Sequence, residues 1–355
     1  MKIAIINDTH FGARADSPIF TDYFFKFFEE QFFPYLKEND IKTVFHLGDL
    51  MDRRKFVNFN TLNNTRKRFL EPLEEMGVKT YVILGNHDTY YKNTNDLNSV
   101  RELVGDFYDN FNIIETPQEL WIEDQGFAMI PWINKSNVDE CMKLLEDTSC
   151  PIACGHFELS GYEVMPGIKH DGGMSDAPLK RFEQVWSGHF HQKSSKGNIH
   201  YLGTQYQITF SDLNIKKGFH VFDTETRNVT FIENPLQMFH AIDYDDTDSE
   251  KIEEWIKTYD FSEYKDGHIK VFVRYKRSPY LFDRFLDKLY NAQVTNVTII
   301  EDMTQEEIDD DDVVDMSKDT LTLIMHEIDG LQLTPEDGSK LKGIIKDLYM
   351  ESLSL

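Results

Sequence analysis

The stretch His46-Leu-Gly-Asp-Leu-Met-Asp-Arg53 decides the fold, because it follows Ile41-Lys-Thr-Val-Phe45, a β-branched and aromatic run typical of a buried strand. Asp49 is therefore expected just past a strand end, where α/β sheets place their ligands. A carboxylate there can bridge two divalent cations about 3.5–4 Å apart, the spacing used in two-metal phosphoryl transfer. Taken alone, Gly-Asp after a strand is also typical of a turn with a solvated aspartate.

Four other apolar strands are each followed by polar residues of the same kind. The residues that follow the five strands are Asp8, His10, Asp49, Asn86, His87, His156, His189 and His191. Carboxylate, amide and imidazole groups are ordinary ligands for manganese, iron or zinc. Each segment alone has a structural alternative, such as an Asx-turn or a lone structural histidine, but five such loops in one chain favour a metal site.

The repeated order of strand, ligand-bearing loop and helix predicts an α/β protein. We expect a two-sheet sandwich flanked by helices, with one metal-rich edge. Helices are predicted over residues 19–38, 58–76, 96–107 and 136–145, and residues 200–210 and 218–222 are predicted to continue as strands. The aromatic residues of 19–38 recur at helical spacing and are expected to pack in the core. Arg66-Lys-Arg68 is either a solvated face or a phosphate contact.

Four regions are predicted along the chain. Residues 1–240 hold the five ligand-bearing loops and are expected to form the first domain, and 241–302 are expected to form a small α+β domain that starts with an acidic joint at 243–250. In that domain we expect helix 250–258, strand 268–276, helix 280–291 and strand 294–301. Residues 303–319 are an acidic flexible linker, and 320–355 are helical and bind a partner. The apolar stripe expected to make that contact is Leu341, Ile344, Ile345, Leu348 and Tyr349.

Composition limits the function classes. The chain of 355 residues carries a formal net charge of −25, and residues 241–355 hold 28 acidic against 13 basic side chains. Because nucleic-acid modules are usually basic, strong DNA affinity is expected to need a partner. There is no apolar run of about 18 residues, and the N-terminus enters a strand directly, which predicts a soluble, non-secreted protein. Three cysteines without paired spacing predict reduced thiols in the cytoplasm.

The motifs Asp8-Thr-His10, Gly48-Asp-Leu-Met-Asp52, Gly85-Asn-His-Asp88, Gly155-His156 and Gly188-His-Phe-His191 occur in the order found in the calcineurin-like metallophosphoesterase superfamily. The resemblance covers about residues 1–235. It implies that 1–240 is a dimetal phosphoesterase (nuclease) domain and that 241–302 is a capping or DNA-recognition domain. The added small domain, the C-terminal apolar helices and stretches such as Tyr201-Leu-Gly-Thr-Gln205 look like the SbcD / Mre-eleven type of nuclease subunit. Lengths and order look most like the recombination nuclease subunit of T-even-type phages, which would place the protein in the host cell cytoplasm.

The resemblance implies two metal ions, most often Mn²⁺, with Mg²⁺ possible. One would be held by Asp8, His10, Asp49 and His191, and the other by Asp49, Asn86, His156 and His189. His87 would donate a proton to the leaving oxygen or stabilise the transition state. We expect Asp52 to hydrogen-bond His87, so that losing Asp52 lowers turnover and leaves the metal content intact. Arg53, Arg54 and Lys55 are candidate DNA contacts or a solvated turn, and the same alternatives hold for Arg274, Lys276 and Arg277.

The function predicted on this basis is a Mn²⁺-dependent DNA nuclease. It would act as an exonuclease on duplex ends and an endonuclease on single strands, in a recombination and double-strand-break repair complex with an SMC-like coiled-coil ATPase. The resemblance also implies a homodimer formed through helices 58–76 and 96–107. The alternatives are a phosphodiesterase or phosphatase acting on a small nucleotide or phosphoprotein, and a metal-free scaffold, which would be expected to have lost ligands.

Overall fold

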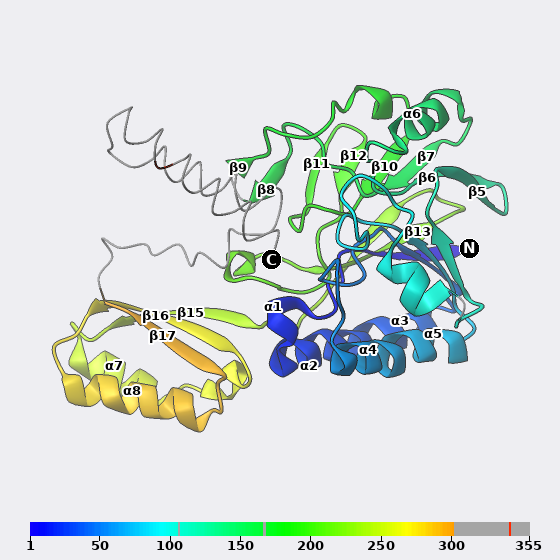
Figure 1. Cartoon of the computed structure of the whole chain (residues 1–355). Helices are drawn as coiled ribbons and strands as arrows, with labels where there is room; N and C mark the ends of the chain where they lie inside the picture. The colour runs from blue at the N-terminus through cyan, green and yellow to red at the C-terminus, as the bar shows by residue number, and fades with distance from the viewer. Residues whose placement is uncertain (106, 166–167, 302–340, 342–355) are drawn as a thin grey trace. The chain divides into compact units, whose positions relative to one another are not determined.

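The computed structural model describes residues 1–105, 107–165, 168–301 and 341 (Figure 1). Its centre is a pair of six-stranded mixed sheets, as the sequence predicted. The first sheet has the order β14-β13-β1-β2-β3-β4. The strands β1 to β4 are parallel to one another, β13 is antiparallel to its neighbour β1, and β14 is antiparallel to its neighbour β13. Its strands are β1 (Lys2–Ile6), β2 (Thr43–His46), β3 (Lys79–Ile83), β4 (Phe111–Ile114), β13 (Gly218–Asp223) and β14 (Val229–Glu233).

The second sheet has the order β11-β12-β10-β7-β6-β5, and its inner strands β12, β10, β7 and β6 are parallel. Its strands are β5 (Gln118–Ile122), β6 (Gln125–Ile130), β7 (Ile152–Gly155), β10 (Gln184–Ser187), β11 (Ser194–Lys196) and β12 (Ile199–Tyr201). Ile5 and Phe45 of the first sheet share one buried cluster with Phe127 and Trp186 of the second. The two sheets therefore pack face to face, and this layer is the centre of the sandwich.

Aromatic helices cover the outer face of the first sheet. Residues 18–38 form one helical segment made of α2 (Pro18–Phe27), a π-helical turn (Phe28–Phe32) and α3 (Phe33–Glu38). Phe24, Phe27 and Phe28 are almost fully buried and cluster with Ala4 and Ile6 of β1. The expectation that the aromatic residues of this segment pack in the core is confirmed.

The predicted helix over 58–76 is also one segment, made of α4 (Phe59–Thr65), a π-helical turn (Arg66–Leu70) and α5 (Glu71–Glu75). It begins at Asn58, whose side chain accepts a hydrogen bond from the Asn60 N–H at 2.8 Å. On the outer face of the second sheet, α6 (Val138–Asp147) buries Cys141 and Leu145. All three cysteines are free and buried.

Two predicted elements are shorter than expected. Over 96–107 the described helical residues are 99–105, of which Arg101–Gly105 form a π-helical turn. The Asn98 side chain accepts from the Arg101 N–H at 2.8 Å and donates to the Asn95 carbonyl at 3.1 Å, which places the helix start after Asn98. Residues 202–209 do not continue the strand β12. The Tyr206 hydroxyl donates to the Thr9 carbonyl at 2.6 Å. This bond holds residues 202–209 against the first ligand loop as an irregular segment, so they do not form a strand.

After β14 the chain forms a three-stranded parallel sheet from β15 (Phe239–Asp245), β16 (His268–Tyr275) and β17 (Asn296–Ile300). The helices α7 (Ser249–Thr258) and α8 (Pro279–Asn291) pack on one face of it through Ile256 and Phe285. The expected acidic joint at 243–250 is partly wrong, because its first residues belong to β15. Asp246 is fully buried and accepts from the Ser278 N–H at 2.8 Å, so this acid has a structural role.

The predicted linker 303–319 and partner-binding segment 320–355 lie outside the described residues, apart from Leu341. Among the helices that the structure describes, none has the length and apolar character needed to cross a membrane.

Candidate metal centre

The ligand-bearing loops come from the carboxyl ends of parallel strands in both sheets. The loops after β1, β2 and β3 leave the first sheet, and the loops after β7 and β10 leave the second. Four of the candidate ligands have a left-handed backbone, namely Asp8 (φ 49°), His10 (φ 42°), Asp49 (φ 57°) and His189 (φ 84°). A left-handed backbone is strained for residues other than glycine, and such strained residues cluster at functional sites. The four residues therefore indicate a functional site at this edge of the sheets.

One group of donors gathers around His10. Its Nε2 lies 3.0 Å from Nε2 of His191, 3.7 Å from Oδ2 of Asp49 and 3.9 Å from Oδ1 of Asp8. Two ligands that bind one ion at about 2.0–2.2 Å from neighbouring directions are themselves about 3 Å apart. These four residues are the set expected for the first ion.

A second group gathers around Asn86. Its Oδ1 lies 2.9 Å from Nε2 of His156 and 3.0 Å from Nδ1 of His189. His156 Nε2 is also 3.3 Å from Oδ2 of Asp49. The same Asp49 oxygen therefore borders both groups, as a bridging carboxylate must.

The donor chemistry fits hard divalent cations. Carboxylates, one amide oxygen and imidazoles surround the site, and each of the three nearby groups of possible ligands is made of aspartate and histidine without a thiolate. Burial lowers the pKa of His189 and of His191 well below the ordinary value, so both rings are neutral and available as ligands. Burial opposes the charge of Asp49, but His156 and His87 hold its pKa well below the ordinary value.

Glycines make this close packing possible. A Cβ added to Gly85 would come within 2.1 Å of Oδ1 of Asp49, and one added to Gly48 within 2.4 Å of Nδ1 of His156. Gly48 also has a φ of 96°, which other residues rarely adopt. The glycines of the motifs are therefore needed for space around the ligands.

Asp88 was not singled out as a site residue by the sequence, yet it holds two ligand loops together. Its carboxylate accepts hydrogen bonds from the backbone N–H groups of Asp49 at 2.8 Å, Leu50 at 2.9 Å and Gly85 at 2.8 Å. Burial and the nearby Asp49 raise its pKa to about 6. Its place in the Gly85-Asn-His-Asp88 motif was the only sequence signal for this role.

His87 lies against both donor groups. Its backbone N–H donates to Oδ1 of Asp49 at 2.7 Å, and its ring packs edge-on to His10 with centroids 4.8 Å apart. The Nδ1–H donates to the backbone carbonyl of Asp52 at 2.5 Å. Nε2 is then the nitrogen left to exchange a proton with substrate.

The expected bond between the Asp52 side chain and His87 is wrong. His87 contacts the carbonyl of Asp52, while the Asp52 carboxylate lies 3.3 Å from Nδ1 of His10. The backbone explains this difference, because the Asp52 N–H donates to the Phe11 carbonyl at 3.1 Å and Met51 pairs with Phe11. Asp52 is thereby held beside the His10 loop.

Residues 1–193 match the family model described as calcineurin-like phosphoesterase. The chain belongs to this family. A curated relative, exonuclease subunit 1 of Enterobacteria phage T4, is 33% identical over 248 residues, which are 69% of this chain and 71% of the relative. The solved structure of a novel archaeal phosphodiesterase aligns with 66% of this chain and 100% of its own, at 15% identity and a TM-score of 0.34, which is too low to establish a shared fold.

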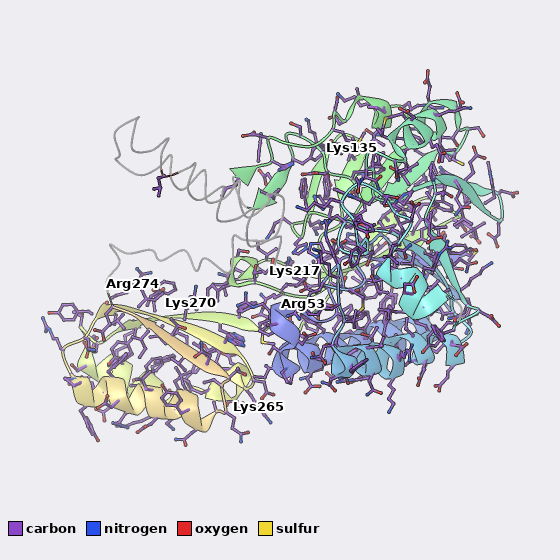
Figure 2. All side chains as sticks on the ribbon, in the orientation of Figure 1. Arg53, Lys135, Lys217, Lys265, Lys270 and Arg274 are labelled. Carbon is purple, nitrogen blue, oxygen red and sulfur yellow. The ribbon has the colours of Figure 1, made fainter. Side chains whose placement is uncertain are left out.

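The candidate DNA contacts of this phosphoesterase form two groups in the sequence, and Figure 2 labels one member of each, Arg53 and Arg274. Beside the metal centre, Arg53 pairs with Asp16 at 2.8 Å and stacks over the Phe56 ring at 4.8 Å, Arg54 is half-buried, and Lys55 is exposed. On the three-stranded sheet, Arg274 donates to Asp243 at 2.6 Å, Lys276 pairs with Glu301, and Arg277 donates to the Tyr275 hydroxyl at 3.1 Å.

The candidate partner-binding residues Ile344, Ile345, Leu348 and Tyr349 lie outside the described residues, and Leu341 is half-buried. Within the basic run Arg66-Lys-Arg68, Arg68 is paired with acidic residues of the protein. Arg68 donates to Glu29 at 2.6 Å and to Asp22 at 2.7 Å, which favours the structural alternative for that residue.

Proposed function

We propose that this phosphoesterase is a Mn²⁺-dependent DNA nuclease that hydrolyses phosphodiesters with two metal ions. It acts as an exonuclease on duplex ends and an endonuclease on single strands. One observation carries the proposal: Oδ2 of Asp49 lies 3.3 Å from His156 and 3.7 Å from His10, between two groups of donors, with His87 beside both. The 33% identity to a protein named exonuclease subunit 1 supports DNA as the substrate.

Each residue has a defined task in this reaction. Asp8, His10, Asp49 and His191 would hold one ion, and Asp49, Asn86, His156 and His189 the other. Bound ions of this kind supply Lewis-acid activation of water and neutralise charge on the phosphoryl oxygens. His87 donates a proton from Nε2 to the leaving oxygen or stabilises the transition state. Nε2 has this role because the Nδ1–H of the ring already donates to the Asp52 carbonyl. Asp88 keeps the Asp49 and Asn86 loops in register.

The proposal includes partners. With a net charge of −25 the chain is poorly suited to hold DNA alone. We assign much of the DNA-binding surface to an SMC-like coiled-coil ATPase bound through residues 320–355, in a recombination and repair complex, and we expect a homodimer formed through the 58–76 and 96–107 segments. The phage relative is itself named as a subunit.

A phosphodiesterase or phosphatase acting on a small nucleotide or phosphoprotein is the second candidate. The family match covers residues 1–193, where the donor groups lie, and the same donors serve both activities. The two candidates differ in the substrate, so substrate comparison separates them.

The test uses the purified full chain with a labelled linear duplex, a single-stranded circle and a p-nitrophenyl phosphodiester, each with Mn²⁺ and with Mg²⁺. His87→Ser is the active-site variant, and Lys143→Ala, at an exposed position of α6, is the comparison. Mn²⁺-dependent DNA degradation that His87→Ser lacks supports the nuclease. Ester hydrolysis with intact DNA, also after a coiled-coil ATPase is added, supports the small-substrate enzyme instead.

A further inference from the structure

The Trp132 side chain lies beside the candidate metal centre and belongs to none of the hydrophobic core clusters of the described residues. It follows β6 in the sequence Pro131-Trp132 and is half-buried. Its ring centroid lies 5.5 Å from that of His189, at 43° between planes, and 6.0 Å from that of His156, at 73°. Within the described part of the chain, the hydrophobic clusters include the next residue, Ile133, but not Trp132. By contrast, Trp186 is fully buried between the two sheets.

The backbone of Trp132 is fixed on both sides. Its N–H donates to the Leu84 carbonyl at 2.7 Å, and its carbonyl accepts from the side-chain amides of Asn137 at 3.0 Å and Asn95 at 3.2 Å. Asn134 ties this arrangement together by donating to Oδ1 of Asn95 at 2.8 Å. An indole on such a backbone is preorganised, so a ligand that stacks on it orders few further groups.

We propose that Trp132 is a stacking platform for the nucleobase of a nucleotide next to the scissile phosphate. This inference rests on the proposed nuclease function, because a base is the flat group that a nucleic acid places one sugar away from its phosphate. An aromatic platform accepts every base through its π-face, which suits an enzyme that degrades DNA without reading its sequence. A phosphoserine peptide or a simple alkyl phosphate has no flat group next to its phosphate that would use the platform.

The test compares two esters that differ only in the nucleoside, the p-nitrophenyl esters of thymidine 5′-phosphate and of methyl phosphate, with the full chain and Mn²⁺. Trp132→Leu keeps apolar bulk without a ring, and Trp132→Phe keeps a ring. Trp121→Leu is the matched control, since Trp121 is 52% exposed on the edge strand β5. Stacking of one base corresponds to a loss of roughly 10- to 100-fold in kcat/KM.

We expect Trp132→Leu to show that loss on the thymidine ester and less than about twofold change on the methyl ester, while Trp132→Phe keeps most of the preference and Trp121→Leu all of it. Equal losses on both esters would assign Trp132 to packing against the histidines and overturn the proposal, as would unchanged kinetics on both. Bound manganese is measured for each variant.

A second measurement does not depend on Trp132→Leu folding. Thymidine monophosphate should quench a part of the tryptophan fluorescence of the wild-type chain that Trp132→Phe lacks, and equal quenching in both overturns the proposal. The DNA assay is independent of these results. A chain that prefers the thymidine ester but leaves DNA intact would retain the platform and lose the proposed nuclease function.

Discussion

The Asp52 carboxylate lies 3.3 Å from Nδ1 of His10, the ring whose Nε2 faces Asp49 and His191. A carboxylate that holds the outer nitrogen of a ligating imidazole fixes the orientation and basicity of the ring. We therefore predict that Asp52→Asn weakens Mn²⁺ binding about 10- to 100-fold. Calorimetric titration of the metal-free protein measures the effect, and activity should recover when Mn²⁺ is raised to saturation.

Asp16→Asn is the matched control, because Asp16 pairs with Arg53 and Thr61 and not with a candidate ligand. Its Mn²⁺ affinity should equal that of the wild type. If Asp52→Asn binds Mn²⁺ normally and still turns over slowly at saturation, Asp52 acts through His87, as the sequence suggested.

Lys217 and Asp212 form a buried ion pair at 2.5 Å, with side chains 3% and 2% exposed. The Lys217 ammonium also donates to the His191 carbonyl at 2.9 Å. Lys217→Met leaves the Asp212 charge buried and unpaired, which should lower the free energy of unfolding by about 3–5 kcal/mol in urea titration. The neighbouring Lys216 pairs with Glu233 at the surface, so Lys216→Met should change the unfolding midpoint little. Equal effects of the two substitutions would rule out a special role for the buried pair.

Phe28 is the centre of the aromatic core under the first sheet. Its ring packs at 4.8 Å from Phe69 and 5.1 Å from Phe27, and it is fully buried. Phe28→Ala removes these contacts and leaves a cavity, so it should cost about 3–5 kcal/mol of unfolding free energy. Phe59 is 88% exposed, and Phe59→Ala should cost less than about 0.5 kcal/mol in the same urea titration. A small loss for Phe28→Ala would mean that the helical segment repacks around the gap.

His220 of β13 makes stability depend on pH. Burial lowers its pKa to about 3, so the ring stays neutral in the folded chain while it protonates near pH 6.5 when unfolded. The unfolded state then binds more protons between these values, and stability falls as the pH drops below 6.5, by about 1.4 kcal/mol per unit.

Between pH 7.5 and 5.0 the wild type should therefore lose about 2 kcal/mol more unfolding free energy than His220→Phe. Urea titrations at both pH values measure this difference. If the two proteins lose the same amount, His220 already titrates normally in the folded state.

The candidate metal centre could be anticipated from sequence because every candidate ligand comes directly after one of five apolar strands. Carboxyl ends of parallel strands meet at one edge, so the separate motifs predicted a common site before any contact was known. The same reasoning missed Trp132, which follows the strand β6 but is not a metal-binding residue type, and Lys217, which precedes β13 and reaches the site only through a hydrogen bond.

Local sequence also failed where side chains compete with the backbone. Asn98 delays a helix that the periodicity placed earlier, and Tyr206 anchors a loop that alternation indicated as a strand. Tyr206 bonds a partner whose position is set by the fold, whereas Asn98 bonds its sequence neighbours Asn95 and Arg101, which is a local capping pattern. The strand β15 could have been found, since Ile242 and Tyr244 are buried and alternate with Asp243 and Asp245.

The sequence by itself determined the two-sheet architecture, the family and the candidate ligands, because strand propensity, motif order and ligand type are local properties of the chain. Only the tertiary structure decided that the Asp52 carboxylate contacts His10 while the Asp52 backbone carbonyl accepts a hydrogen bond from His87. The pairing of Met51 with Phe11 sets that choice. A contact between loops from different strands depends on how the strands align, and no spacing along one loop contains that information.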